Sequence, residues 1–343
     1  MPPEGPAPPL PELAGTAHWH LFDIDADAEK AALIRLDEPD YRQAGFLDQR
    51  ILPAAPERRM TSLAELDEAL SEGPATAADP AFIFHIGHCG STLLSRAFDA
   101  SAHTLPLREP LTLRRLPLLD AARRESLLKL VLRAHGRAFH PRQIPVIKAT
   151  SICNGLIEPV LNHRPASRAL LMYVDLDTYL AGMLGKHQPA RDLRGHIEAR
   201  LADWQSLPGA PVLDPGSLDE ARLAALAWLT GMRHLATAGA ATGGRVRLLH
   251  FETFLESPEQ HLKSLAAWFG LDDDLPDLLE AWPAVSTGYS KKPDEPYSAF
   301  NRRRTLHRGR LERASDIQAG LRWAESMIDQ TAGLSVCSPY LRP

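Results

Sequence analysis

The sequence predicts an α/β fold, in which a parallel sheet lies between two layers of helices and carries a small N-terminal addition. Short apolar runs suited to buried strands alternate with longer stretches whose apolar residues recur at helical spacing. In residues 81–100 this alternation is compact, because a strand-like run leads through a glycine-punctuated turn directly into a helical pattern. With 343 residues, 44% of them hydrophobic, the chain can bury a large core.

The N-terminal part is expected to lie outside the main sheet. Residues 1–15 are rich in proline, which favours a disordered tail. A strand is expected at 18–24 and short helices at 29–36 and 63–70, the last capped by Thr61 or Ser62 with Glu65 at the capping-box position. Residues 71–80 have the composition of a linker. The predicted division is a disordered tail at 1–15, a small N-terminal α+β addition at 16–78 and the α/β domain at 79–343.

The main domain is expected to supply the alternating strands and helices. Strands are expected at residues 82–86, 104–109, 144–149, 166–174 and 245–251. Helices are expected from Ser91, as one or two segments within 111–139, and at 175–184, 218–235 and 258–269, the last ended by Gly270. Because ligands of such sheets bind at the carboxyl ends of the strands, we look for site residues there.

The turn after the first of these strands has the features of an anion site. Gly87 and Gly90 let the backbone approach a ligand closely. A helix beginning at Ser91 would direct N–H groups and the positive end of its dipole toward the turn, and Ser91 and Thr92 add hydroxyl donors. The expected ligand is a phosphate or a sulfate ester. The alternative is an ordinary short glycine turn between a strand and a helix.

The turn is not a Walker A loop, since G-H-C-G-S-T is shorter and lacks the lysine. It resembles the 5′-phosphosulfate loop of sulfotransferases, which in many bacterial and Golgi-type members reads roughly G-x-x-R-S-G-T-T-L after a strand. The residues from Cys89 to Leu93 occupy the positions of S-G-T-T-L, whereas His88 stands where the family usually has arginine or lysine. Histidine carries only part of a positive charge near neutral pH.

Two later segments extend the resemblance. Residues 250–271 are similar to the family's late strand–helix unit, and residues 289–304 to the basic segment near the C-terminus of many bacterial members. The resemblance therefore spans roughly residues 80–310. It implies the sulfotransferase type of the P-loop nucleoside-triphosphate-hydrolase fold. It also implies 3′-phosphoadenosine 5′-phosphosulfate (PAPS) as the co-substrate, with no metal ion.

The resemblance assigns donor binding to the turn and the helix after it. The residues concerned are Gly87, His88, Cys89, Gly90, Ser91, Thr92 and Arg96. His88 is also a candidate cationic donor to the leaving oxygen, the alternative being a hydrogen bond to the loop backbone. Arg96 follows Thr92 by one helical turn and is expected to reach phosphate, the alternative being a surface ion pair. Cys89 is either a reactive thiol or a small residue at the serine position.

Glu109 and Lys148 complete the predicted catalytic set with His88. Glu109 follows the second strand, and in tyrosylprotein-type sulfotransferases a glutamate at about this separation from the loop acts as base. The alternative is a glutamate that merely favours a helix start. Arg108 is expected to orient the site or to lower the pKa of Glu109. Lys148 matches the lysine of the K-T-H strand of cytosolic sulfotransferases, with Thr150 in place of the histidine, the alternative being a surface lysine at a strand end.

The region of the 3′-phosphate departs most from the family. Sulfotransferases usually have a strand that ends R-x-P, whereas here Asp175 and Asp177 follow the strand and would repel a phosphate. Residues 289–310 carry a local excess of five positive charges, expected either as a solvated helix face or as a clamp over an anionic donor. The candidates to compensate are this basic segment and three polar residues: Ser151, Asn154 and Lys186.

Composition limits the partners of the chain. The net charge of −5 gives no overall attraction to nucleic acid. No run reaches the roughly 18 apolar residues of a membrane span, and no signal peptide is visible, so a cytoplasmic protein that does not bind membranes is expected. The three cysteines have neither metal-type nor disulfide-type spacing, and His18 with His20 lacks a third ligand, so no metal site is expected.

Three functions remain open from the sequence. The first is a PAPS-dependent sulfotransferase acting on a hydroxyl or amine of a small molecule or peptide. The second is a phosphotransferase that uses ATP and Mg²⁺, for which Asp175 and Asp177 would be metal-facing carboxylates. The third is a non-catalytic nucleotide-binding protein on the same fold, which the missing loop arginine favours.

Overall fold

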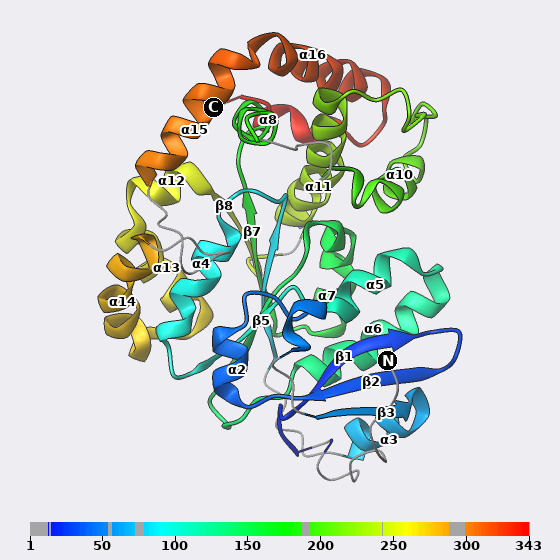
Figure 1. Cartoon of the computed structure of the whole chain (residues 1–343), viewed down its shortest axis with the longest axis vertical. Helices are drawn as coiled ribbons and strands as arrows, with labels where there is room; N and C mark the ends of the chain where they lie inside the picture. The colour runs from blue at the N-terminus through cyan, green and yellow to red at the C-terminus, as the bar shows by residue number, and fades with distance from the viewer. Residues whose placement is uncertain are drawn as a thin grey trace.

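A computed structural model gives the structure of the chain for residues 13, 15–53, 57–72, 79–186, 193–241, 243–287 and 299–342 (Figure 1). Most of the expected tail at 1–15 and most of the expected linker at 71–80 fall outside these ranges, as do residues 289–298 of the basic segment. Within the ranges described, no helix combines the length and apolarity needed to cross a membrane.

The main domain is built on a five-stranded sheet in the order β5-β6-β4-β7-β8. Its strands are β4 (Ala81–His85), β5 (Thr104–Arg108), β6 (Ile144–Lys148), β7 (Arg168–Tyr173) and β8 (Val246–His250). All neighbouring strands run parallel. Every residue of β4 and β5 is buried, as expected when helices cover both faces of a parallel sheet. The predicted fold class is confirmed, and each strand lies where the apolar runs place it.

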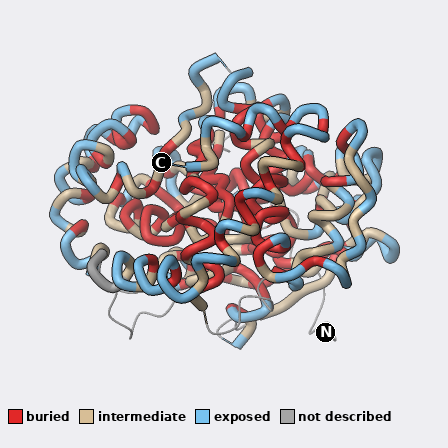
Figure 2. The backbone as a smooth tube through the Cα atoms, turned by 90° about the horizontal axis from the view of Figure 1, so that it is seen from above, coloured by how far each residue is buried: buried red, intermediate tan, exposed pale blue. Residues whose placement is uncertain are grey.

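Helices lie on both faces of this sheet (Figure 1). One face carries α4 (Ser91–Ala97), α13 (Pro258–Phe269) and α14 (Leu275–Thr287). The other carries α7 (Ile157–His163) and the long apolar α11 (Glu220–Ala241). Buried residues fill the middle of the molecule between the layers (Figure 2). The predicted helix at 258–269 is confirmed, with Gly270 at its C-cap in the left-handed conformation.

A second group of helices packs beyond the end of β7. It consists of α8 (Leu176–Leu184), α15 (Ala299–Glu312) and α16 (Ala314–Gln330), with α11 beneath them. The contact of α15 with α8 depends on Gly309, where a Cβ atom would lie 2.3 Å from the Ala181 carbonyl oxygen. Further helices of the main domain are α10 (Ile197–Gln205), α12 (Phe251–Glu256), η2 (Phe98–Ala100), η4 (Ser151–Leu156), η5 (Asp272–Asp274) and η6 (Ser335–Tyr340).

The N-terminal addition is a three-stranded antiparallel sheet of β1 (Trp19–Asp25), β2 (Lys30–Arg35) and β3 (Arg58–Ser62). The expected helix at 29–36 is wrong, because this segment is the central strand β2. Its short apolar run does not distinguish a strand from a helix, and pairing with both β1 and β3 satisfies its backbone. The strand at 18–24 is confirmed.

Three short helices complete the addition and its surroundings: α2 (Glu38–Gln43), η1 (Gln49–Ile51) and α3 (Leu63–Glu72). The predicted helix at 63–70 is confirmed as α3. The Ser62 hydroxyl accepts from the Glu65 N–H at 3.1 Å, and the Glu65 carboxylate accepts from the Ser62 N–H at 3.0 Å. These reciprocal bonds are the predicted capping box.

The addition meets the main domain along a contact that we call the seam, formed by β1 and α2 against β5, α5 (Leu111–Arg115) and α6 (Ala121–His135). The region 111–139 is thus two helices, joined by η3 (Leu116–Leu118). Buried arginines hold the seam together. Arg137 donates to the carbonyl oxygens of Leu13 and Thr16 in the N-terminal segment. These donors satisfy buried backbone acceptors across the seam, so the seam is held by specific hydrogen bonds.

Candidate active site

The loop between β4 and α4 adopts the strained path expected of an anion-binding turn. Gly87, His88 and Gly90 have φ angles of 85°, 53° and 72°, all in the left-handed region that favours glycine. A Cβ atom at Gly90 would lie 2.0 Å from the Phe251 ring, so only glycine fits there. Among the described non-glycine residues, positive φ occurs at Glu29, His88 and Glu109, which include two of the predicted catalytic residues.

The polar residues after the loop are almost enclosed. Ser91 and Thr92 are 4% and 5% exposed and form the first turn of α4. Cys89 is fully buried, its thiol lies 3.3 Å from the Met172 carbonyl oxygen, and burial raises its pKa to about 11. A thiol with this pKa stays protonated at neutral pH, which favours the interpretation of Cys89 as a small filling residue.

A lysine from α8's C-terminal end reaches the loop. The Lys186 ammonium nitrogen lies 3.1 Å from each ring nitrogen of His88. Tyr179, one helical turn or more back on α8, lies 6.4 Å from the same ring, measured between centroids. A lysine from a distant segment of the chain therefore lies beside position 88. In the sequence Lys186 was one of several candidates to compensate at the 3′-phosphate.

Glu109 and Lys148 form an ion pair at the carboxyl ends of the adjacent strands β5 and β6. Lys148 is 1% exposed as a side chain and Glu109 14%, so the pair is largely shielded from water. The Thr150 hydroxyl lies 3.5 Å from the second carboxylate oxygen of Glu109. The structure thus brings together the two residues that the sequence placed on separate strands.

This pair lies close to the loop. Ile83 of β4 is paired with Lys148 of β6, and the positive charges of Lys148 and Arg302 both act on the Cys89 thiol. A Cβ atom at Gly87 would lie 3.6 Å from the Ser151 hydroxyl, which begins the segment after β6. The loop and the Glu109–Lys148 pair therefore share one site at the carboxyl ends of β4, β5 and β6. We call this site the carboxyl edge.

Two arginines predicted for the site have their contacts elsewhere. Arg108 points to the seam and pairs with Asp99, so the expectation that it orients the site is wrong. β5 ends at Arg108, and Glu109 follows it with a φ of 51°, so the chain turns between the two residues and their side chains have different neighbours. Arg96 lies 3.8 Å from Asp99 in an ion pair and beside Gly45. The pair with Asp99 fits the ion-pair alternative, and the proposed site does not include Arg96.

The two aspartates after β7 are occupied by the protein itself. Asp175 caps α8 by accepting from the Thr178 N–H at 2.8 Å, and His250 lies 3.5 Å from its other oxygen. Burial opposes ionisation of Asp175, but the bonds from His250 and Thr178 outweigh it and lower its pKa. Asp177 pairs with Arg310 of α15 at 2.6 Å. The predicted repulsion of a phosphate is therefore reduced, because Arg310 neutralises Asp177.

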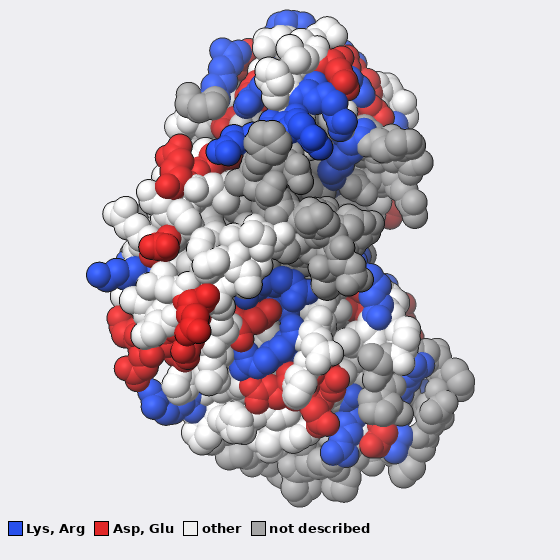
Figure 3. Space-filling view, turned by 60° about the vertical axis from the view of Figure 1, so that its left-hand side comes forward, with Lys and Arg blue, Asp and Glu red and all other residues white. Residues whose placement is uncertain are grey.

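The described part of the basic segment is the helix α15. Arg302 pairs with Glu252 at 2.5 Å, and its guanidinium lies 4.9 Å from the centre of the Phe251 ring, which itself covers Gly90. In Figure 3 lysine and arginine side chains gather over the upper part of the molecule, where α15 lies. The N-terminal part of α15 thus places Arg302 close to the loop. Its C-terminal part packs on α8 through the close contact of Gly309 with Ala181.

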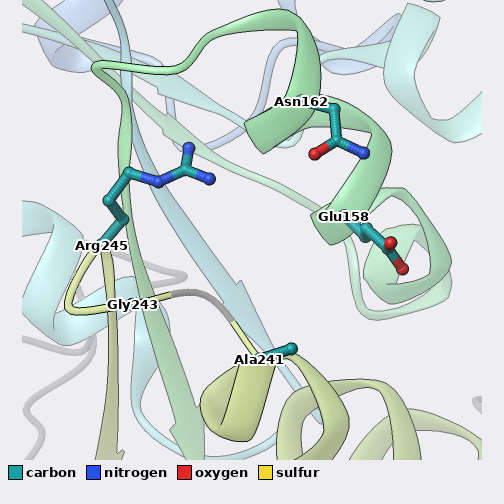
Figure 4. A pocket seen from close by; sticks show the side chains of 5 residues that line it. All are labelled: Glu158, Asn162, Ala241, Gly243 and Arg245. Carbon is teal, nitrogen blue, oxygen red and sulfur yellow. The ribbon is translucent and has the colours of Figure 1, made fainter.

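Two cavities lie at opposite edges of the sheet. One, of about 420 Å³, opens between α5, η4 and the start of α10, and its lining includes Leu111, two residues after Glu109. The other, of about 370 Å³, is lined by Glu158, Asn162 and Arg245 at the amino-terminal ends of β7 and β8, away from the loop (Figure 4). Among the described residues, no group of three or more histidines, cysteines, aspartates or glutamates is arranged to hold a metal ion.

No family model matches the chain, and no curated protein matches it by sequence. Solved structures with similarity include a sulfotransferase of Mycobacterium avium, 12% identical, with a TM-score of 0.41 over 73% of this chain and 80% of that one. A sulfotransferase of Mycobacterium tuberculosis is 13% identical, with a TM-score of 0.41 over 64% and 76%. A mouse sulfotransferase complexed with PAP is 11% identical, with a TM-score of 0.36 over 78% and 96%. At these identities and TM-scores the similarities assign no activity, so function has to be read from the site.

Proposed function

We propose that the chain transfers a sulfuryl group from PAPS to a hydroxyl or amine acceptor. The observation that carries this proposal is the Glu109–Lys148 ion pair, which faces a phosphosulfate-type loop from the ends of two neighbouring strands. A carboxylate is the form of glutamate that accepts a proton, and an adjacent ammonium stabilises that form. Lys186 at His88 adds positive charge at the loop, where an anionic donor would lie.

The proposed step is an in-line displacement at sulfur. The acceptor oxygen forms a bond to sulfur while the bond between sulfur and the bridging oxygen breaks, and the electron pair leaves on the 5′-phosphate of adenosine 3′,5′-bisphosphate. The acceptor proton passes to the Glu109 carboxylate. Lys148 and His88, the latter with Lys186 beside it, meet the charge that develops on the leaving oxygen. Most of the rate enhancement would come from positioning and from these fixed charges.

The 3′-phosphate is assigned to α15 in this proposal. Arg302 comes close to the loop through Phe251, and Arg310 offsets the charge of Asp177. Asn154, a candidate from the sequence, instead donates to the His85 carbonyl oxygen at 3.1 Å and so supports the loop from below. The basic segment is therefore the more suitable partner for a phosphate than the strand end that the family uses.

The phosphotransferase is the second candidate function, and Asp175 and Asp177 are the observation that would favour it. Both carboxylates already have partners, one as a helix cap and the other in an ion pair with Arg310. A magnesium ion would have to displace these contacts before either aspartate could coordinate it. This cost makes sulfuryl transfer the better supported proposal.

Calorimetric titration with nucleotides tests the proposal. Adenosine 3′,5′-bisphosphate and ATP are titrated separately into the purified chain, each with and without Mg²⁺. We expect metal-independent binding of the bisphosphate. Binding of ATP only with Mg²⁺ would support the phosphotransferase instead. Binding of neither nucleotide would leave a non-catalytic protein as the better explanation.

A variant of the loop between β4 and α4 tests whether the bisphosphate binds there. Replacement of Ser91 and Thr92 together by alanine removes two hydroxyl donors at the first turn of α4 and is expected to weaken bisphosphate binding. The exposed Ser264→Ala on α13 is the matched control. Unchanged binding by the double variant would show that the nucleotide is not bound by this loop.

A further inference from the structure

The cavity of about 420 Å³ is lined by segments that directly follow the two strands of the Glu109–Lys148 pair. Leu111, Arg114 and Arg115 lie on α5, which follows β5 and Glu109 directly. Ile152 lies on η4, which follows β6 and Lys148. The cavity, of about 420 Å³, has the size of a small-molecule site, for which roughly 300–1,000 Å³ is usual. A molecule in it would lie beside the proposed base.

The third wall, at the start of α10, is also within electrostatic reach of Glu109. His196 lines the cavity, and its pKa is lowered by burial and by the charges of Arg200 and Arg114, whereas Glu109 acts in the opposite direction. Leu111, which follows Glu109 by two residues, and Arg114 line the same cavity as His196. The cavity therefore begins near the proposed base along the chain and reaches the arginines of α5.

The cavity combines an apolar wall with a basic rim. Leu111, Ile152 and Ile197 supply the apolar wall. Arginines on two elements supply the rim: Arg114 and Arg115 from α5, and Arg194 from the segment before α10. Glu198 is the acidic residue that lines it. This lining suits a molecule that is apolar over most of its surface and negatively charged at one end.

The positive charges of the rim arginines are only partly compensated by their acidic partners. Arg115 is matched by Asp23 at 3.0 Å, but the single carboxylate of Asp48 is shared between Arg114 at 3.1 Å and Arg50 at 2.6 Å. Within the described chain, Arg194 donates only to backbone carbonyl oxygens, of Pro215 at 3.1 Å and Leu218 at 3.4 Å. An incoming carboxylate, sulfate or phosphate would find arginine donors there and a partly compensated positive charge.

We infer that this cavity is the acceptor site and that it selects small acceptors with an apolar body and an acidic group, which Arg194 and Arg114 bind while the hydroxyl faces Glu109. The inference rests on the proposed sulfotransferase function, whose acceptor it narrows to an anionic class. Nothing in the loop or the ion pair requires such an acceptor, so the two proposals are tested separately.

The test uses three 4-substituted phenols whose substituents are of similar size and carry a negative, no or a positive charge: 4-hydroxyphenylacetate, its methyl ester and tyramine. Each is titrated calorimetrically into the full chain saturated with adenosine 3′,5′-bisphosphate, at a fixed ionic strength of about 0.1 M. We expect the carboxylate to bind about tenfold more tightly than the ester and tyramine to bind most weakly. Equal affinities, a preference for tyramine, or no binding of any phenol would overturn the inference.

Two variants assign the preference to the rim. Arg194→Gln should reduce the preference for the carboxylate at least about threefold, and Arg114→Gln provides a second probe whose partner Asp48 keeps Arg50. Arg222→Gln, an exposed arginine of α11 that does not line the cavity, should leave the preference unchanged. A preference that survives in both rim variants would contradict the assignment.

If the proposed sulfotransferase function is wrong, the titrations give a result that differs from the one expected when only the acceptor inference is wrong. If the bisphosphate does not bind, sulfuryl transfer is overturned, and the three phenols are titrated without nucleotide. A carboxylate preference that is lost in Arg194→Gln would then still support an acid-binding cavity. If the bisphosphate binds and the phenols show no preference, the donor site stands and the inference about the acceptor fails.

Discussion

The seam and the carboxyl edge both bury positive charge, but they use it differently. At the seam Arg108 donates to the Ala44 carbonyl oxygen and the Ser95 hydroxyl and pairs with Asp99, and Arg137 donates to a group of carbonyl oxygens. At the carboxyl edge Lys148 and Lys186 instead lie next to two other titratable side chains, Glu109 and His88, beside a backbone loop. The arginines of the seam thus donate to several backbone carbonyl oxygens as well as to Asp99, whereas the described contacts of the two lysines are with titratable side chains.

The contrast is sharpest between two neighbours in the sequence. Arg108 ends β5 and Glu109 follows it directly, yet the side chain of Arg108 lies at the seam and that of Glu109 at the carboxyl edge. Substitution of the first should therefore affect folding and substitution of the second should affect chemistry. The following predictions, from the largest expected effect to the smallest, test whether that division holds.

Glu109→Gln should reduce turnover by about 10²- to 10⁴-fold, because the amide cannot accept the acceptor's proton. Steady-state rates with PAPS and a phenol measure the loss, and bisphosphate affinity should stay close to that of the unchanged chain. Unaltered turnover would remove Glu109 as the base. The free energy of unfolding, followed in urea, should also fall, because buried Lys148 loses the charge of its partner. Retained bisphosphate affinity therefore shows that the variant is folded and that the lost turnover is chemical.

Arg108→Met should lower the free energy of unfolding by about 3–5 kcal/mol, since it leaves the Asp99 carboxylate buried without its main partner. Urea unfolding at neutral pH measures this. The double variant with Asp99→Asn should recover part of the loss, which a simple packing defect would not. If Arg108→Met is as stable as the unchanged chain, the seam does not depend on this pair.

Acid should destabilise the seam through its buried histidines. Burial, aided by the charge of Arg137, lowers the pKa of His135 to about 3, and burial also lowers the pKa of His20, which stacks on it. The unfolded chain binds a proton at His135 near pH 6.5, so stability is complete above that pH and falls between about pH 6.5 and 3. At pH 4 His135 alone should cost about 3 kcal/mol.

The histidine variant separates this effect from general acid unfolding. His135→Gln should flatten the dependence of unfolding free energy on pH by about 1.4 kcal/mol per unit between pH 6 and 4. The exposed His307→Gln on α15 should keep the original slope. An unchanged slope in His135→Gln would mean that this histidine does not titrate on unfolding.

Lys186→Met has the smallest predicted effect and tests the carboxyl edge, as Arg108→Met tests the seam. We expect about a tenfold loss of bisphosphate affinity, because one charge beside the loop is removed. The free energy of unfolding should stay within about 0.5 kcal/mol. Lys129→Met, an exposed lysine of α6, serves as control in both measurements. A loss of stability without a loss of affinity would move Lys186 to the structural set.

The sequence predicted the main sheet well, because its strands are buried on both faces and read as continuous apolar runs. It also placed the loop, Glu109 and Lys148 at strand ends, which a parallel sheet collects at one edge. It misassigned β2, where a run of six residues has no periodicity strong enough to decide between helix and strand. There the pairing with β1 and β3, a non-local interaction, determines the conformation.

The sequence was weaker on which side chains enter the site. Arg108 was expected to act in the site with Glu109, but the chain turns at Glu109, whose φ of 51° no local sequence pattern indicated. The contact of Lys186 with His88 joins residues 98 positions apart and follows from the packing of α8, which no local pattern reports. The cavity likewise depends on three elements that meet only in the folded chain.

The contact between Gly90 and Phe251 has a consequence for how this chain can vary. The ring occupies the space that any side chain at position 90 would need, and Arg302 lies on the ring. A larger residue at 90 is therefore acceptable only together with a smaller one at 251, and that change would also remove the surface on which Arg302 rests. The three positions form an epistatic unit, in which the order of substitutions decides which sequences remain accessible.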